Sequence, residues 1–237
     1  RKLLKLPLKK QRGMLKNMGK EMKDKKERIE NGNLTITFLR HSSKGPDGNL
    51  SKEGIIKASE LDIRINSNSN VEIYTSDIQR SVDTGTIIGK KLRILQPKIS
   101  PILSEHPYTD EKIEELGLSG GKWLLVENAN RLLAGKLAKF TLDQLTSKKS
   151  IHDSQIIAIS HVPPIMAFLG HILVYSEKKN SIDEEIKTKL FESFDGFVKP
   201  LKGFDIHIMS SNPDEMQVVF PKNRISIPIS LLRNLAK

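Results

Sequence analysis

The sequence contains no cysteine among its 237 residues. This absence excludes disulfide bonds, thiolate metal sites and cysteine nucleophiles, and it fits a chain that does not depend on an oxidising compartment. The six histidines show no HxxxH or similar spacing, the pattern that places two metal ligands on one helix face. We therefore expect neither a metal ion nor a cofactor.

Long apolar segments are also missing. No run approaches the roughly 20 residues that a membrane-spanning helix needs. The first residues show neither the continuous apolar stretch nor the small-residue cleavage site of a signal peptide. Hydrophobic residues make up 37% and charged residues 28% of the chain, as in ordinary globular proteins. We expect a cytoplasmic protein without a transmembrane segment, and the sequence gives no indication of its oligomeric state.

Positive charge is unevenly distributed along the chain. The net charge is +11, and residues 1–30 contain twelve Lys or Arg against four Asp or Glu, which accounts for +8 of it. We therefore divide the chain into a basic extension over residues 1–32, flexible or helical, and one domain over residues 33–237. Such an extension can make weak contacts with an anionic membrane surface or with RNA through charge alone.

The periodicity of the apolar residues predicts an α/β protein. Apolar runs at 34–39, 71–74 and 156–159 predict buried strands. Further predicted elements are helices over 55–61, 78–92, 124–145 and 165–174, a short strand over 99–103, and a terminal hairpin of strands 204–209 and 216–220. This order favours a three-layer α/β/α fold, in which helices cover both faces of a mixed, mostly parallel sheet. We expect the functional site at the carboxyl ends of the strands.

Cationic and imidazole side chains follow three of these strands. Arg40 and His41 end the first strand, Arg80 lies in the first turn of the helix after the second, and His161 follows the strand at 156–159. Arginine forks hold phosphate dianions well. A neutral imidazole can attack phosphorus, and a carboxylic acid can protonate the leaving oxygen. An acidic segment from 104 to 121 contains candidates for that acid.

The sequence around these strand ends resembles the motifs of the histidine phosphatase superfamily, branch 1, the phosphoglycerate mutase-like fold. The first motif is Arg40-His41 with the segment Gly48-Asn-Leu-Ser-Lys-Glu-Gly54 before a helix. The second is the run from Thr75 to Thr84, similar to Ser-x-x-x-Arg-x-x-x-Thr, and the third is Ile159-Ser160-His161. Three motifs in this order cover most of residues 33–175, and they imply the phosphoglycerate mutase-like fold.

The resemblance also implies roles for single residues. His41 is implied to be the nucleophile that becomes phosphohistidine, while Arg40, Arg80 and His161 line the phosphate pocket. Glu105 stands where the family usually carries its proton donor, and Glu111 and Glu114 are the alternatives. The implied activity is that of a metal-independent phosphatase, and the implied partner is a small phosphorylated substrate.

One position departs from the family pattern, because Ser42 follows the Arg-His pair where glycine is usual. Its hydroxyl predicts either an additional phosphate ligand or reduced activity. Two other functions remain open: phosphoryl transfer of the phosphoglycerate mutase type, and a non-catalytic phosphate-binding module whose basic tail binds nucleic acid or membrane. Specificity is expected in the loops at 42–49, 105–123 and 176–200.

Overall fold

The structure is a computed structural model of the chain. It describes residues 33–63, 65, 69–105, 127–147, 153–178, 198–220 and 224–237. The basic extension, Glu111, Glu114 and most of the two later specificity loops lie outside these residues. Within the described ranges, no helix has the length and apolar character that crossing a membrane requires.

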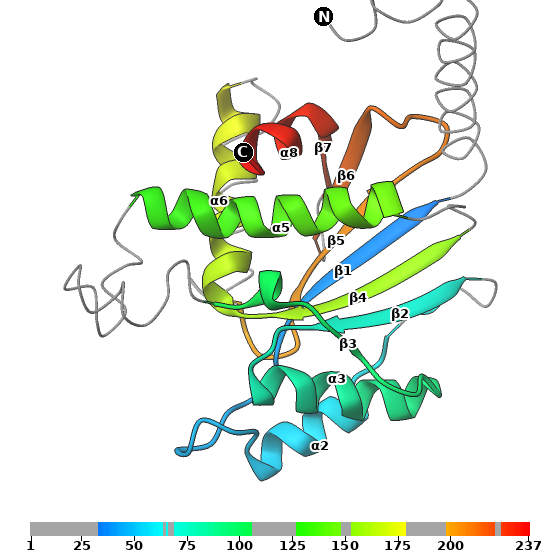
Figure 1. The fold of residues 1–237 in the computed structure, drawn as a ribbon, viewed down its shortest axis with the longest axis vertical. Coiled ribbons are helices and arrows are strands. Elements are labelled where there is room, and N and C mark those ends of the chain that lie inside the picture. Colours follow the sequence, from blue (N-terminus) through cyan, green and yellow to red (C-terminus); the bar gives the residue numbers. More distant parts are fainter. Residues whose placement is uncertain are drawn as a thin grey trace, which may run out of the picture.

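A seven-stranded mixed sheet forms the centre of the molecule (Figure 1). Its strands are β1 (Leu34–Arg40), β2 (Asn70–Thr75), β3 (Lys98–Ile99), β4 (Ser154–Ser160), β5 (Gly203–Ile208), β6 (Glu215–Val219) and β7 (Arg224–Pro228). The spatial order is β3-β2-β4-β1-β5-β6-β7. The first four strands in this order are parallel, and β5, β6 and β7 each run antiparallel to the preceding strand. The predicted mixed sheet, with its parallel centre and its terminal hairpin, is confirmed.

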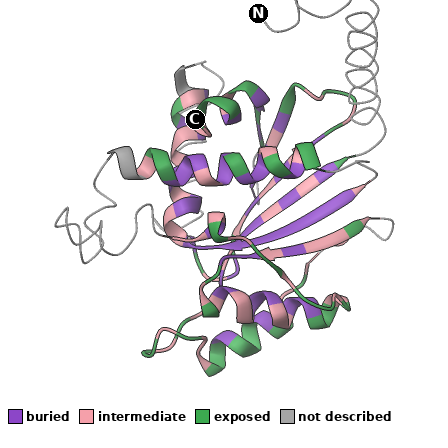
Figure 2. Cartoon of the chain, viewed as in Figure 1, coloured by how far each residue is buried: buried purple, intermediate pink, exposed green. Residues whose placement is uncertain are grey.

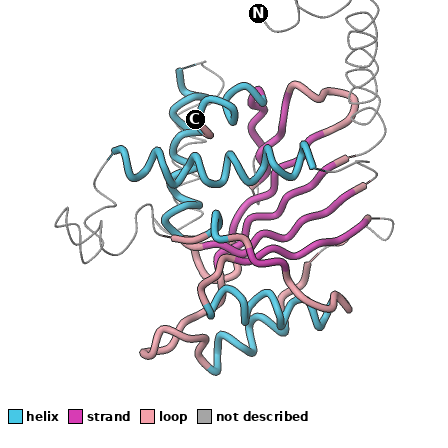
Figure 3. The backbone as a smooth tube through the Cα atoms, viewed as in Figure 1, coloured by secondary structure: helices cyan, strands magenta, loops and turns pink. Residues whose placement is uncertain are grey.

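Helices cover both faces of this sheet (Figures 1 and 3). On one side lie α2 (Lys52–Glu60) and α3 (Gln79–Leu92), and on the other α5 (Glu127–Ser147), α6 (Val162–Lys178) and α8 (Ile229–Leu235). Strand β4 contributes to both cores, since Ile156 and Ala158 pack in one cluster with Phe168 of α6, while Ile157 and Ile159 pack with Ile88 of α3. The predicted three-layer α/β/α architecture is therefore confirmed.

The continuous apolar run of β4 follows from its position. The strand is paired on both edges and covered on both faces, and every one of its seven residues is buried (Figure 2). A strand in this environment has no solvent side, so its sequence does not alternate. β1, next to it, has a mixed pattern of buried and half-buried residues and ends in Arg40.

Two boundaries differ from the prediction because of proline. The expected strand over 99–103 is only the two residues of β3, followed by the short 3-10 helix η2 (Pro101–Leu103). Pro101 has no N–H for a sheet ladder, and its fixed φ suits a first helical turn. For the same reason α6 begins at Val162 and takes both Pro163 and Pro164 into its first turn, earlier than expected. β7 and α8 were not predicted.

Candidate active site

The carboxyl ends of the central parallel strands bring the predicted residues together. Strand β4 lies between β1 and β2, and its last residue, Ser160, pairs with Arg40 at the end of β1. His41 then donates its backbone N–H to the carbonyl of Ser160 at 3.0 Å. The imidazole rings of His41 and His161 lie 5.0 Å apart between centroids. The residues predicted for the site thus lie together at this edge of the sheet.

The His41 side chain is only 4% exposed and has a defined hydrogen-bonding pattern. Its Nδ1 lies 2.6 Å from the carbonyl oxygen of Ser42. Because a carbonyl can only accept, Nδ1 carries the hydrogen and Nε2 carries the lone pair. Arg80 donates its Nε–H to this Nε2 at 3.0 Å. The neutral tautomer with the hydrogen on Nδ1 and a lone pair on Nε2, which accepts from Arg80, is therefore the one that fits.

Burial lowers the pKa of His41 to about 4. The hydrogen bond to Ser42 opposes this shift, and the positive charges of Arg80 and Arg40 add to it. A buried imidazole beside two guanidinium groups is costly to protonate, because desolvation and like charge both disfavour the cation. His41 is therefore neutral at neutral pH.

Two arginines lie near His41, Arg40 at the end of β1 and Arg80 at the start of α3. Arg80, at the start of α3, pairs through Nη2 with Oε1 of Glu105 in addition to its contact with His41. Arg40 donates from Nη1 to the carbonyl of Val198 at 2.7 Å, and its Nε is buried without a hydrogen-bond partner among the described residues. Burial lowers the pKa of Arg40, and the nearby charge of Arg80 acts in the same direction. Arg40 remains cationic at neutral pH, because a guanidinium group has a very high intrinsic pKa.

Glu105 lies between Arg80 and His161. While one carboxylate oxygen contacts Arg80, the other lies 3.4 Å from Nδ1 of His161. The Glu105 side chain is 22% exposed, and that of His161 is completely buried. The carboxylate is thus the more exposed of the two groups and lies toward the solvent side of the cluster.

Ser42 is close to His41, but its hydroxyl is directed elsewhere. It donates to the carbonyl of Gly54 at 2.7 Å, and the Ser42 backbone N–H donates to Oγ1 of Thr84 at 3.1 Å. With its hydrogen used in this way, the hydroxyl offers only lone pairs to a phosphate oxygen. The geometry therefore favours a structural role, in which Ser42 joins β1 to α2, over the predicted phosphate contact.

The sequence interpretation assigned no role to three neighbours of the site. Ser76 places its Oγ 2.8 Å from Nε2 of His161, Thr84 accepts from Ser42, and Val198 holds Arg40. Ser76 and Thr84 lie inside the motif from Thr75 to Thr84, so the motif could have marked both as neighbours of the site. The contact of Val198 uses a backbone carbonyl, which any residue type supplies, so no sequence pattern marks it.

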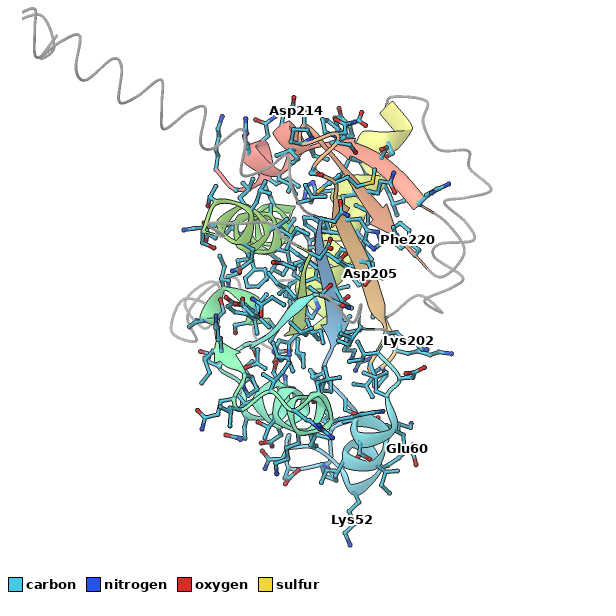
Figure 4. The ribbon with its side chains drawn as sticks, turned by 90° about the vertical axis from the view of Figure 1, so that its right-hand side faces the viewer. Lys52, Glu60, Lys202, Asp205, Asp214 and Phe220 are labelled. Atoms are coloured by element: carbon cyan, nitrogen blue, oxygen red, sulfur yellow. The ribbon has the colours of Figure 1, made fainter. Side chains whose placement is uncertain are left out.

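A separate hollow of about 1040 Å³ lies over β1 and β5 and contains none of the predicted site residues. Lys202, Asp205 and Phe220, labelled in Figure 4, contribute to its lining. Lys202, His207 and three aspartates also line this hollow. We place the candidate site at His41, because the residues that the sequence motifs predict come together there and not in the hollow. Among the residues that the structure describes, no group of three or more His, Asp or Glu side chains is arranged to hold a metal ion.

Comparisons with known proteins give a match to one family model over part of the chain, and a similarity in fold. The family model "Histidine phosphatase superfamily (branch 1)" matches residues 37–116. No curated protein matches the chain. Among solved structures, "Mycobacterial hydrolase 1" is similar with 14% identity and a TM-score of 0.50, over 74% of this chain and 92% of the other. At this identity, the likeness supports a shared fold alone.

Two further solved structures are similar at lower TM-scores. A mycobacterial glucosyl-3-phosphoglycerate phosphatase has 14% identity and a TM-score of 0.46, over 74% of this chain and 92% of its own. A phosphoglycerate mutase from Bacillus anthracis has 13% identity and a TM-score of 0.44, over 88% of this chain and 99% of its own. The family model covers both the Arg40-His41 motif and the segment from Thr75 to Thr84. The match to the histidine phosphatase superfamily, branch 1, therefore covers residues 37–116, about a third of the chain.

Proposed function

We propose that the protein is a metal-independent phosphatase that hydrolyses phosphomonoesters through a phosphohistidine intermediate on His41. The observation that carries this proposal is the state of His41: a buried, neutral imidazole whose Nδ1–H is held by Ser42 and whose Nε2 lone pair faces the cationic cluster. A nucleophile needs an unprotonated lone pair at neutral pH, and Nε2 has one once Arg80 turns its Nε–H from Nε2 to the bound phosphate. We also propose that residues 33–237 form the catalytic domain.

Substrate binding uses the two arginines. The phosphate dianion replaces the Glu105 carboxylate at Arg80 and accepts from the Nε–H of Arg40, which has no hydrogen-bond partner in the part of the chain that the structure describes. Since both guanidinium groups are largely removed from water, their hydrogen bonds to a charged acceptor are stronger than those of exposed arginines. The neighbouring cations also offset the charge that develops on the equatorial oxygens in the transition state.

The first chemical step forms a phosphorus–nitrogen bond and breaks the phosphorus–ester oxygen bond. The lone pair of Nε2 attacks phosphorus, and the leaving oxygen takes the bond's electron pair together with a proton from Glu105 in its acid form. Nδ1–H of His41 stays bonded to the Ser42 carbonyl, which stabilises the positive charge on the ring. The products of this step are the alcohol, phosphohistidine and the Glu105 carboxylate.

The second step returns the enzyme to its starting state. A water molecule attacks phosphorus and transfers a proton to the Glu105 carboxylate, while the phosphorus–nitrogen bond breaks and its electron pair returns to Nε2. Inorganic phosphate leaves. Glu105 serves as acid in one step and as base in the other, for which its partial exposure is suitable.

The test is hydrolysis of an aryl phosphate in the presence of EDTA. We expect turnover by the wild type, inhibition by vanadate, and a loss of about 1,000-fold or more in kcat for His41→Gln, as for removal of a nucleophile. His207→Gln is the matched control, because His207 lies on β5 and outside the cluster. Equal activity of the two variants would contradict the proposal.

The same protein preparations distinguish the other two functions. Conversion between phosphoglycerate isomers without net phosphate release would assign a mutase. Absence of turnover on aryl phosphates and phosphoglycerates, together with loss of partner binding on truncation of residues 1–32, would assign a binding module.

A further inference from the structure

We propose that Ser76 is a positioning residue that fixes the tautomer of His161, so that His161 presents its Nδ1–H to the phosphate of the substrate. The assignment rests on the proposed function of the site, and it adds a residue for which neither the motif nor the family match states a role. Ser76 follows β2 and is completely buried, as is His161.

The contacts of the Ser76 hydroxyl define its donor and acceptor roles. Its oxygen accepts the backbone N–H of Ile78 at 3.3 Å and lies 2.8 Å from Nε2 of His161. Since one lone pair of the hydroxyl already receives a hydrogen, its own hydrogen is directed best at an acceptor. In a neutral imidazole with its hydrogen on Nδ1, the lone pair of Nε2 accepts this hydrogen at 2.8 Å.

The opposite side of the ring supports the same tautomer. Nδ1 of His161 lies 3.4 Å from Oε2 of Glu105. If Nδ1 carried the lone pair, it would face a carboxylate oxygen, and two acceptors would repel each other. If it carries the hydrogen, it faces an acceptor, while Nε2 faces the donating hydroxyl of Ser76. The Nδ1–H tautomer is therefore the neutral form in which both ring nitrogens meet complementary groups.

The Ser76 backbone is held in place by hydrogen bonds, so its hydroxyl can fix the tautomer of His161. Its N–H lies 3.2 Å from both the carbonyl of Ile159 and Oγ of Ser81. The hydroxyl of Ser81 in turn donates to the same Ile159 carbonyl at 2.9 Å. The turn between β2 and α3 is thus bonded to the end of β4, the strand that precedes His161, so Ser76 and the imidazole keep a fixed separation.

The consequence for the site is a second oriented donor. In the structure, the Glu105 carboxylate lies between Arg80 and the Nδ1 of His161. A substrate phosphate oxygen is also an anionic acceptor, and in the same position it meets the Nδ1–H that Ser76 has set. A ring in the other tautomer would instead present a lone pair to the phosphate and weaken its binding in the transition state.

The experiment combines nuclear magnetic resonance with kinetics. In protein labelled with nitrogen-15 histidine, the two ring nitrogens of His161 report the tautomer directly, whether or not the protein turns over substrate. For the wild type we expect the Nδ1–H form, and for Ser76→Ala a mixture of tautomers. We also expect kcat of Ser76→Ala to fall by about 10- to 100-fold, the range for loss of one oriented hydrogen bond to a charged group.

Two further variants separate this role from general damage to the turn. Ser81→Ala removes another completely buried hydroxyl, at the start of α3, which accepts from the backbone N–H of Ser76. Because that N–H also lies 3.2 Å from the carbonyl of Ile159, the backbone of Ser76 should stay in place and the His161 tautomer should be retained. Ser76→Thr keeps a hydroxyl and should restore both the tautomer and kcat. Unfolding temperatures of all variants show whether each one is folded.

The outcomes are distinct from those that test the proposed function. An unchanged His161 tautomer in folded Ser76→Ala would overturn the assignment of Ser76, even if the wild type is an active phosphatase. Equal loss of kcat in Ser76→Ala and Ser81→Ala, with no tautomer change in either, would also overturn it. A wild type without turnover would instead contradict the proposed function, and the nitrogen shifts would still decide whether Ser76 fixes the His161 ring.

Discussion

The low pKa of His41 predicts that mild acid destabilises the fold. The folded protein holds this pKa at about 4, against an ordinary value of 6.5. As the pH falls below about 6.5, the unfolded chain therefore takes up a proton that the folded protein still rejects. The stability that depends on neutral His41 is complete above that pH and is lost between about 6.5 and 4.

The size of this effect follows from the pKa shift. A shift from 6.5 to about 4 corresponds to about 3.5 kcal/mol in full, since one pKa unit is worth about 1.4 kcal/mol, and about 3 kcal/mol of it is lost by pH 4. Solvent screening reduces this little, because His41 is only 4% exposed. Below about pH 4 both states bind the proton, so the effect reaches a plateau there.

Urea unfolding of the wild type and of His41→Gln between pH 7.5 and 4 measures this pH-dependent loss of stability. Glutamine does not titrate, while the other ionisable groups are the same in both proteins. We expect the free energy of unfolding of the wild type to fall by about 3 kcal/mol more than that of the variant over this range. A difference between the two proteins that stays constant within about 0.5 kcal/mol would refute the account of a neutral, buried His41.

Three further predictions concern other residues. Arg80→Ala should lower kcat by about 100- to 1,000-fold with an unchanged circular dichroism spectrum, and a loss below tenfold would remove Arg80 from transition-state stabilisation. Gly54→Ala should cost about 1–3 kcal/mol in urea unfolding, because the added Cβ would lie 2.2 Å from the carbonyl oxygen of Ser43. Gly170→Ala, whose Cβ would meet nothing within 4 Å, is its control, and equal midpoints would contradict the packing argument. Phe38→Ala should cost about 3–5 kcal/mol, since the ring is fully buried among other aromatic rings, and a much smaller loss in the same assay would contradict that packing.

The central fold could be predicted because its strands are recognisable from the local sequence alone. β1, β2 and β4 are apolar runs that end in polar residues, and the helix start at Ser51 carries a recognisable cap, whose hydroxyl accepts from the N–H of Gly54. β7 could not be predicted in the same way. Its Ile225 and Ile227 alternate with polar residues over only five positions, and its stability comes from pairing with β6. A short edge strand of this kind depends on tertiary contacts rather than on local propensity.

The site shows the same division between local and long-range information. Arg40, Arg80, His41 and His161 could be predicted, because each follows a strand and motif spacing joins them. The direction of the Ser42 hydroxyl could not, since it depends on the carbonyl of Gly54, twelve residues away and brought close by the start of α2. A sequence motif identifies which residue types converge, but hydrogen-bond direction is decided by the backbone around them.

The measurement that tests the central claim most directly is the trapping of the covalent intermediate. Wild-type protein is mixed rapidly with an aryl phosphate, quenched in alkaline denaturant that preserves phosphohistidine, and mapped by mass spectrometry, with His41→Gln processed in parallel. We predict one phosphoryl group on His41, formed and lost at least as fast as the enzyme turns over, and none in the variant. Full turnover without phosphoryl transfer to His41, or with the label on another residue such as His161, would contradict the account.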